Sequence, residues 1–99
     1  MADIPVRVIR SYLATRETYE RRRRYYRTDT VCAFATVQAQ FAWTMAKIRL
    51  LRASGASPTL IKMAGEEMGT ALHNLAYFRG RYPQLSDKSI RQEELTLGV

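Results

Sequence analysis

The chain has 99 residues, which suffices for one domain and not for two, because domains most often have about 100–150 residues. A hydrophobic fraction of 46% and a charged fraction of 25% exclude a mostly disordered chain, a collagen-like fibre and a disulfide-rich scaffold. Sixteen Lys and Arg residues against nine Asp and Glu residues give a formal net charge of +7, so acidic surfaces and nucleic acids are the partners to consider. We therefore expect residues 1–99 to form a single basic domain.

The first predicted helix covers residues 4–27. Asp3 is a suitable N-cap, Pro5 is tolerated in a first turn, and no glycine or further proline interrupts the rest of the segment. An alternative is that Val6 and Val8, which alternate with an arginine, form a short strand like that of ribbon-helix-helix repressors. The long helical segments that follow do not fit those repressors, so the helix is the preferred interpretation.

Two further helices are predicted over residues 31–53 and 58–80. Gly55 is placed to end the earlier one in the left-handed conformation, and Ser57 with Pro58 begins the later one as an N-cap and a first-turn proline. Both segments carry apolar residues at three- and four-residue spacing, which is typical of a helix. These apolar stripes are Phe34, Val37, Phe41, Met45, Ile48 and Leu51, and then Leu60, Ile61, Ala64, Met68, Ala71, Leu72, Leu75 and Phe78.

The short turn between these two helices predicts an antiparallel hairpin, and the helix over 4–27 would pack along it or reach a partner. Gly65 and Gly69 stand four residues apart and would let another helix approach closely. The tail over 84–99 contains a candidate short helix over 87–95. The expected fold is all-α, an elongated three-helix bundle with helices about 33–36 Å long. Its core is thin, so we expect a homodimer.

The sharpest local feature is the run Arg21–Arg27, RRRRYYR, at the end of the first predicted helix. Arginine and tyrosine together provide phosphate contacts and base stacking. Because consecutive helical residues point about 100° apart, the run cannot face one nucleic-acid backbone as a whole. Glu17 and Glu20 are spaced for ion pairs with it, so a solvated helix end and a contact with an acidic protein are competing interpretations. The candidate nucleic-acid-binding residues are Arg16, Arg21, Arg22, Arg23, Arg24, Tyr25, Tyr26 and Arg27.

Trp43 lies away from the apolar stripe of its helix. Tryptophans outside an intramolecular core are frequent interface anchors, whereas a helix buried on several sides would make this one an ordinary core residue. Tyr12 and Tyr19 lie near one line of the first predicted helix, and Tyr77 lies on a line of the third helix away from its main apolar stripe. These tyrosines are placed to contact a neighbouring helix or another chain. The candidate protein-interface residues are Tyr12, Tyr19, Trp43 and Tyr77.

Residue types for catalysis or metal binding are scarce. His73 is the only histidine and Cys32 the only cysteine, no group of residues has metal-ligand spacing, and no glycine-rich phosphate loop is present. We therefore expect no enzymatic activity, no metal and no cofactor. The N-terminal segment lacks the apolar region of a secretory signal, and the longest uncharged stretch, residues 30–46, is too short to span a membrane. With a single cysteine, the expected location is cytoplasmic.

In size and arrangement alone, the chain resembles small helical regulators of bacteria and phages that sequester transcription factors or other machinery. The predicted function is therefore that of a non-enzymatic helical protein, homodimeric, which binds a protein partner through a helical face and blocks that partner's interaction surface. One alternative is a nucleic-acid-binding module that uses the Arg- and Tyr-rich end of the first helix. Another is a structural subunit of a larger assembly such as a phage particle.

Overall fold

The computed structural model describes residues 3–24, 30–85, 88 and 91. Its helices are α1 (Val6–Arg24), α2 (Thr30–Ala53) and α3 (Pro58–Arg81). The described residues contain no strand, which confirms the all-α class, and the strand alternative near the N-terminus is wrong because those residues begin α1. Residues 25–27 of the first predicted helix lie outside the described residues, as does the short helix predicted over 87–95 apart from two of its positions.

Gly55 ends α2 as the sequence predicts. Its φ is +71°, in the left-handed region that a residue without Cβ adopts at little cost. The N–H of Gly55 donates to the carbonyl of Arg52 at 3.2 Å, and the N–H of Ala56 donates to that of Leu51 at 3.0 Å. These two bonds form a Schellman motif, which satisfies carbonyls that the end of the helix would otherwise leave unpaired.

The start of α3 also follows local chemistry. Ser57 is the N-cap, its side-chain oxygen accepts a hydrogen bond from the N–H of Leu60 at 3.4 Å, and Pro58 is the first helical residue. The start of α1 differs from the prediction. This helix begins directly after Pro5, whose carbonyl accepts the first backbone hydrogen bonds, so the proline precedes the first turn and Asp3 does not cap it.

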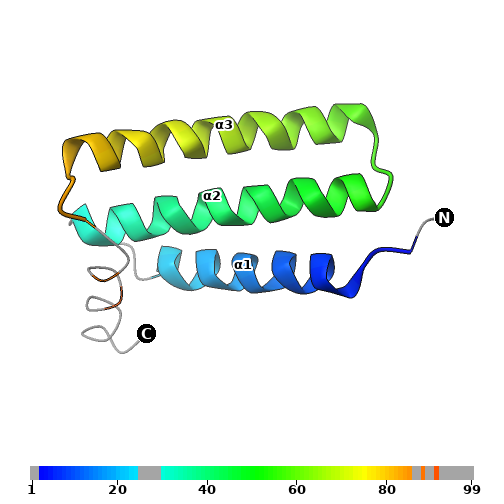
Figure 1. Cartoon of the computed structure of the whole chain (residues 1–99), viewed down its shortest axis with the longest axis horizontal. Coiled ribbons are helices and arrows are strands. Elements are labelled where there is room, and N and C mark those ends of the chain that lie inside the picture. The colour runs from blue at the N-terminus through cyan, green and yellow to red at the C-terminus, as the bar shows by residue number, and fades with distance from the viewer. Residues whose placement is uncertain (1–2, 25–29, 86–87, 89–90, 92–99) are drawn as a thin grey trace.

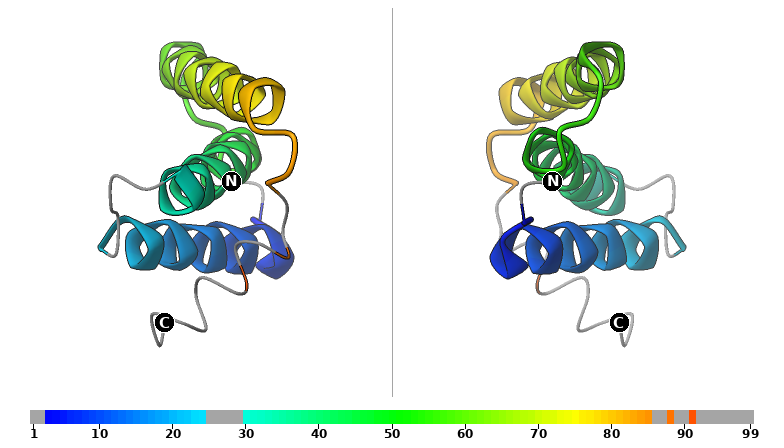
Figure 2. Two further views of the ribbon diagram at one scale, coloured as in Figure 1. Left: turned by 90° about the vertical axis from the view of Figure 1, so that its left-hand side faces the viewer. Right: turned by 90° about the vertical axis from the view of Figure 1, so that its right-hand side faces the viewer.

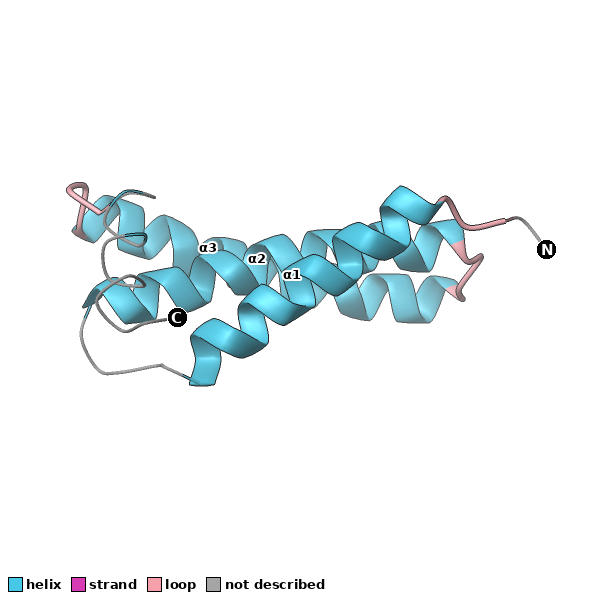
Figure 3. Ribbon diagram, turned by 90° about the horizontal axis from the view of Figure 1, so that it is seen from below, coloured by secondary structure: helices cyan, strands magenta, loops and turns pink. Residues whose placement is uncertain are grey.

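The three helices lie side by side in a row with α2 in the middle (Figure 1). The end views in Figure 2 place α1 and α3 on opposite sides of α2, and α1 crosses the other two helices obliquely in Figure 3. Within the described residues, α1 and α3 each pack against α2 and do not contact one another. The predicted helical bundle is therefore present in an open form, because its helices do not enclose a common core.

The core between α2 and α3 contains few large side chains. Phe34 and Leu75 are its largest buried members, and Phe78 packs against them with its ring centroid 6.2 Å from that of Phe34. Most other buried apolar positions are alanines, namely Ala33, Ala35, Ala39, Ala46, Ala64 and Ala71. The prediction that Leu60 and Leu72 belong to the core is wrong, since they are 51% and 48% exposed. Because α3 has only one neighbouring helix, its broad apolar stripe is not covered over its whole width.

Leu85 packs against the same cluster after the chain leaves α3. Its N–H donates to the carbonyl of Tyr82 at 3.0 Å, which closes a turn and returns the chain towards the start of α2 (Figure 1). The stripe analysis did not identify this contact. A leucine beyond the end of a helix has no helical period to reveal which way it faces.

Candidate protein-binding surfaces

Three of the four predicted interface residues meet within the chain. Tyr12 and Tyr19 are seven residues apart, which puts them on one side of α1, and both face Trp43 of α2. The ring of Tyr19 is stacked on that of Trp43 at 5.1 Å, and Tyr12 is tilted at 6.5 Å. Such pairs contribute about 0.5–1.5 kcal/mol beyond the area they bury. This aromatic cluster therefore joins α1 to α2.

The indole N–H of Trp43 is buried and has no hydrogen-bond partner among the described residues. A buried donor without a partner costs about 1–3 kcal/mol. The cluster consequently stabilises the α1–α2 contact through ring packing and not through hydrogen bonding by the indole.

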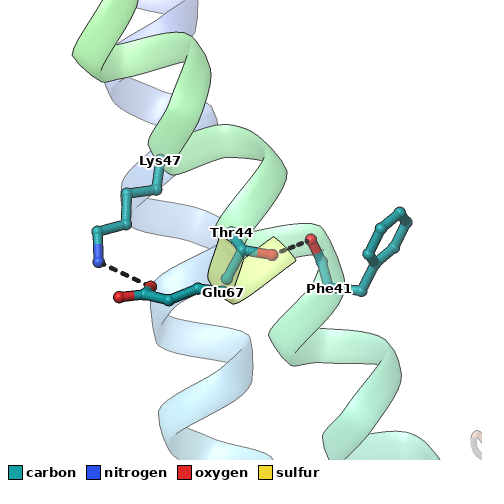
Figure 4. Close-up of polar contacts among 4 residues, drawn as sticks. All are labelled: Phe41, Thr44, Lys47 and Glu67. Carbon is teal, nitrogen blue, oxygen red and sulfur yellow. Dashed lines mark hydrogen bonds and ion pairs between the residues drawn. The ribbon is translucent and has the colours of Figure 1, made fainter. Parts of the chain in front are cut away.

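Lys47 extends the cluster from α2 to α3. Its ammonium nitrogen lies 5.4 Å from the centroid of the Trp43 ring. The same nitrogen lies 3.1 Å from a carboxylate oxygen of Glu67 (Figure 4). Both partners of this ion pair are partly exposed, so it contributes at most about 1 kcal/mol. Beneath it, the hydroxyl of the buried Thr44 donates to the carbonyl of Phe41 at 2.9 Å, so no unpaired hydroxyl is left in the α2–α3 contact.

Tyr77, the fourth predicted interface residue, lies apart from the aromatic cluster on α3. It is 58% exposed and meets Phe78 edge to face at 5.8 Å. The four candidate residues therefore do not form one surface. Three contribute to the packing of α1 on α2, and one remains largely open to solvent.

The arginines at the end of α1 have separate surroundings. Arg22 donates to the carbonyl of Ala35 at 3.2 Å and to the side-chain oxygen of Gln38 at 3.3 Å, so it holds the end of α1 against α2. Arg23 pairs with Glu20 at 3.2 Å and lies over a tyrosine ring, Tyr19. Arg21 is partly buried, whereas Arg16 and Arg24 are exposed. The remaining candidates of this run, Tyr25, Tyr26 and Arg27, lie outside the described residues.

A groove lined by arginines follows the other side of the row. Two hollows lie along the seam between α1 and α2, one beside Arg7 and Arg49 and the next beside Arg22. A third hollow lies between α2 and α3 and is also lined by Arg49, together with Arg52. We call these three neighbouring hollows together the arginine groove. Sequence reasoning missed it, although two arginines three residues apart on a helix with one further charged residue were a usable signal.

The walls between these arginines are apolar or small. Ala39, Ala42 and Ala46 recur at helical spacing along α2 and line the first two hollows. Met45 and Ile61 line the third. Ala42 is exposed, whereas Ala39 and Ala46 are buried at the foot of the seam. The first two hollows are also lined by the polar residues Ser11, Thr15, Thr18 and Gln38.

The arginine groove and the aromatic cluster occupy opposite sides of α2. Met45 lines the groove and Trp43 belongs to the cluster. Residues two positions apart on a helix point about 200° apart around its axis, so these two side chains lie on nearly opposite sides. The acidic partners Glu20 and Glu67 pair with cations that lie over the rings of the cluster. None of the acidic residues that the structure describes lines any of the three hollows. The two faces of the row therefore differ in charge.

Large apolar side chains are also exposed at several places on the two outer helices, and we call them the outer apolar residues. They are Val6, Ile9 and Leu13 on α1, and Leu60, Met63, Leu72 and Tyr77 on α3. Val6 and Leu13 are 60% and 52% exposed, and α1 contains no fully buried residue at all. Single exposed hydrophobic residues are ordinary, whereas seven large ones on the two outer helices indicate contact surfaces.

The described residues contain no group of three or more His, Cys, Asp or Glu that could hold a metal ion. His73 is exposed on α3, and Cys32 is a free thiol buried in α2. None of the helices in the described part of the chain combines the length and the apolar character needed to cross a membrane. No family model matches this chain, and neither a curated protein nor a solved structure matches it significantly.

Proposed function

We propose that this protein is a non-enzymatic interaction module that binds a protein partner through the outer faces of its helices, and that binding blocks a surface of that partner. The observation that carries this proposal is the open row of helices. Because α1 and α3 each contact only α2, the outer apolar residues stay exposed. Burying them against a partner would gain about 25 cal/mol for each Å² removed from water.

The arrangement around α2 supports a module of this kind. The short turn over 54–57 and the packing of α3 on α2 support the antiparallel hairpin predicted from the sequence, and α1 lies on the opposite side of α2. A row of this form presents both outer helices at once. A second copy of the chain is one partner that would cover them, so homodimerisation through the outer apolar residues is part of the proposal.

The arginine run gives less support to nucleic-acid binding. Arg22 is engaged with α2, Arg23 pairs with an acidic residue, and Arg21 also has a contact, so most of the described arginines of the run are engaged within the chain. A protein with a net charge of +7 binds nucleic acids weakly in any case, and salt weakens that binding further.

The test is quantitative affinity purification from cells that express the tagged protein, with two matched pairs of variants. Leu72→Gln removes an outer apolar residue, and His73→Gln changes its exposed polar neighbour. Leu13→Gln and Glu17→Gln form the same comparison on α1. Gln is a good helix former, so none of these changes should disrupt its helix.

We expect at least one protein to be retained by the wild type and by His73→Gln and Glu17→Gln, and to be lost with Leu72→Gln or Leu13→Gln. Light scattering on the purified variants shows whether that protein is a second copy of the chain. The proposal would be refuted if all four variants retained the same proteins as the wild type and light scattering showed the wild type to be a monomer.

A further inference from the structure

Of the four arginines of the groove, Arg22 holds the end of α1 against α2, whereas the other three form no hydrogen bond or ion pair with the described residues. Arg7, Arg49 and Arg52 are exposed, and no described residue forms an ion pair with them. They place three guanidinium groups along one open face, in addition to the engaged Arg22, and no described acidic residue lines the three hollows. Like charges held close together repel, which raises the affinity of this face for an anionic partner.

The groove is also apolar along its floor. Ala42 and Ala46 lie between the arginines of the α1–α2 seam, and Met45, Ile61 and Met68 line the α2–α3 hollow. A ligand that offered charge alone would leave this apolar surface exposed to water. The complementary occupant has an apolar stripe for the floor and acidic groups beside it for the arginines.

The dimensions of the groove fit a helix. Arg7 and Arg22 are separated by 15 helical residues, so the groove extends about 22 Å along α1. A partner helix of about 15 residues, or four turns, has that length. Small residues on the floor allow close approach of the partner backbone, and a helix placed there would contact α1 and α3 together. It would complete the open row into a bundle of four helices.

Gly65 of α3 lines the hollow between α2 and α3. A Cβ at this position would meet no atom within 4 Å, although the residue is inside α3 and lines the groove. Nothing in the described chain therefore fills the space beside this glycine.

From the charge, the floor and the length, we propose that the arginine groove binds an acidic amphipathic helix of a protein partner. This inference rests on the proposed function and specifies a second site for it, distinct from the outer apolar residues. The partner helix carries leucine-like residues at three- and four-residue spacing, with Asp and Glu on the flanks that face Arg7 on one side and Arg49 and Arg52 on the other.

The experiment is a selection from a displayed library of 18-residue helical peptides, with the full-length protein as target. The peptides share a fixed leucine stripe, and their other positions vary among Glu, Lys, Gln and Ala. The groove variant is Arg7→Glu with Arg49→Glu. Its matched control is Arg16→Glu with Arg24→Glu, which makes the same charge change at two exposed arginines that line none of the three hollows.

We expect the enriched peptides to be acidic. We also expect them to bind roughly tenfold or more weakly to the groove variant, since loss of one or two close charge pairs is of that order, and to bind the control with little change. Circular dichroism confirms that both variants fold, and Arg7→Gln with Arg49→Gln replaces the groove variant if charge reversal unfolds it.

Four results would each overturn the inference: no enrichment, enrichment of basic or neutral peptides, equal loss of binding in both variants, and duplex DNA binding at physiological salt that only the groove variant loses. A dimeric wild type and control with a monomeric groove variant would also overturn it, because the groove would then be occupied by a second copy of the chain. These outcomes leave the proposed function intact if the Leu13 variant still loses a partner, because Leu13 lines none of the three hollows and lies on α1 away from them.

Discussion

Replacing Trp43 with alanine tests how α1 is attached to the rest of the protein. The side chain contacts Tyr12 and Tyr19 of α1 and the ammonium group of Lys47, while α1 itself has no fully buried residue. Truncation of a buried tryptophan costs about 3–5 kcal/mol, and we expect about 3 kcal/mol here because this one is only partly buried. That is a large part of the roughly 5–15 kcal/mol by which small domains are stable.

The assay is urea denaturation followed by circular dichroism, since Trp43 is the only tryptophan and its fluorescence disappears with the substitution. Two controls separate the contributions. Trp43→Phe keeps a ring against Tyr19 and removes the buried indole N–H that has no partner, so its cost should be about 1 kcal/mol. Tyr77→Ala removes an exposed ring and should cost less than about 1 kcal/mol. A free energy of unfolding for Trp43→Ala that matches the wild type would refute this account of the α1–α2 contact.

Other substitutions test the local chemistry of the helices by the same denaturation assay. Gly69→Ala should raise the free energy of unfolding by up to about 1 kcal/mol, because the added Cβ meets nothing within 4 Å in a helix interior. A lower free energy of unfolding would indicate a close helix contact there. Gly55→Ala should destabilise by about 1 kcal/mol, because its φ of +71° strains any other residue; an unchanged midpoint would contradict the Schellman motif. Ser57→Ala should cost about 1 kcal/mol through loss of the N-cap, and equal stability would show that the cap contributes nothing. A double-mutant cycle on Lys47 and Glu67 should give a coupling below about 1 kcal/mol that decreases with salt, and a salt-independent coupling would be inconsistent with an exposed ion pair.

Helix ends were predictable from the sequence because neighbouring residues determine them. Gly55 supplies the left-handed conformation, and Ser57 with Pro58 supplies a cap and a residue without an N–H, whatever the rest of the chain does. The start of α1 was less predictable. Pro5 restricts the residue before it and its own carbonyl begins the helix, so the aspartate that the sequence offers as a cap lies too far upstream.

The apolar pattern did not predict which side of each helix contacts which neighbouring helix. α2 is apolar on most sides and has neighbours on two of them, so its main stripe did not show where α1 packs. Trp43 lies off that stripe because it serves the second contact. The arginine groove was missed for a related reason. Arg7 and Arg22 are far from Arg49 and Arg52 in the sequence, and only the packing of α1 on α2 brings them to one face.

The central claim is that the outer helices of an open row bind a protein partner, and carbene footprinting tests it most directly. The free protein is labelled, digested and quantified by mass spectrometry, and the labelling is repeated with one equivalent of the partner found by affinity purification. We predict strong labelling of Leu13 and Leu72 in the free protein, weak labelling of the buried Leu75, and protection of Leu13 or Leu72 by the partner. Labelling of Leu13 and Leu72 as weak as that of Leu75 in the monomeric protein, or unchanged by the partner, would contradict the claim.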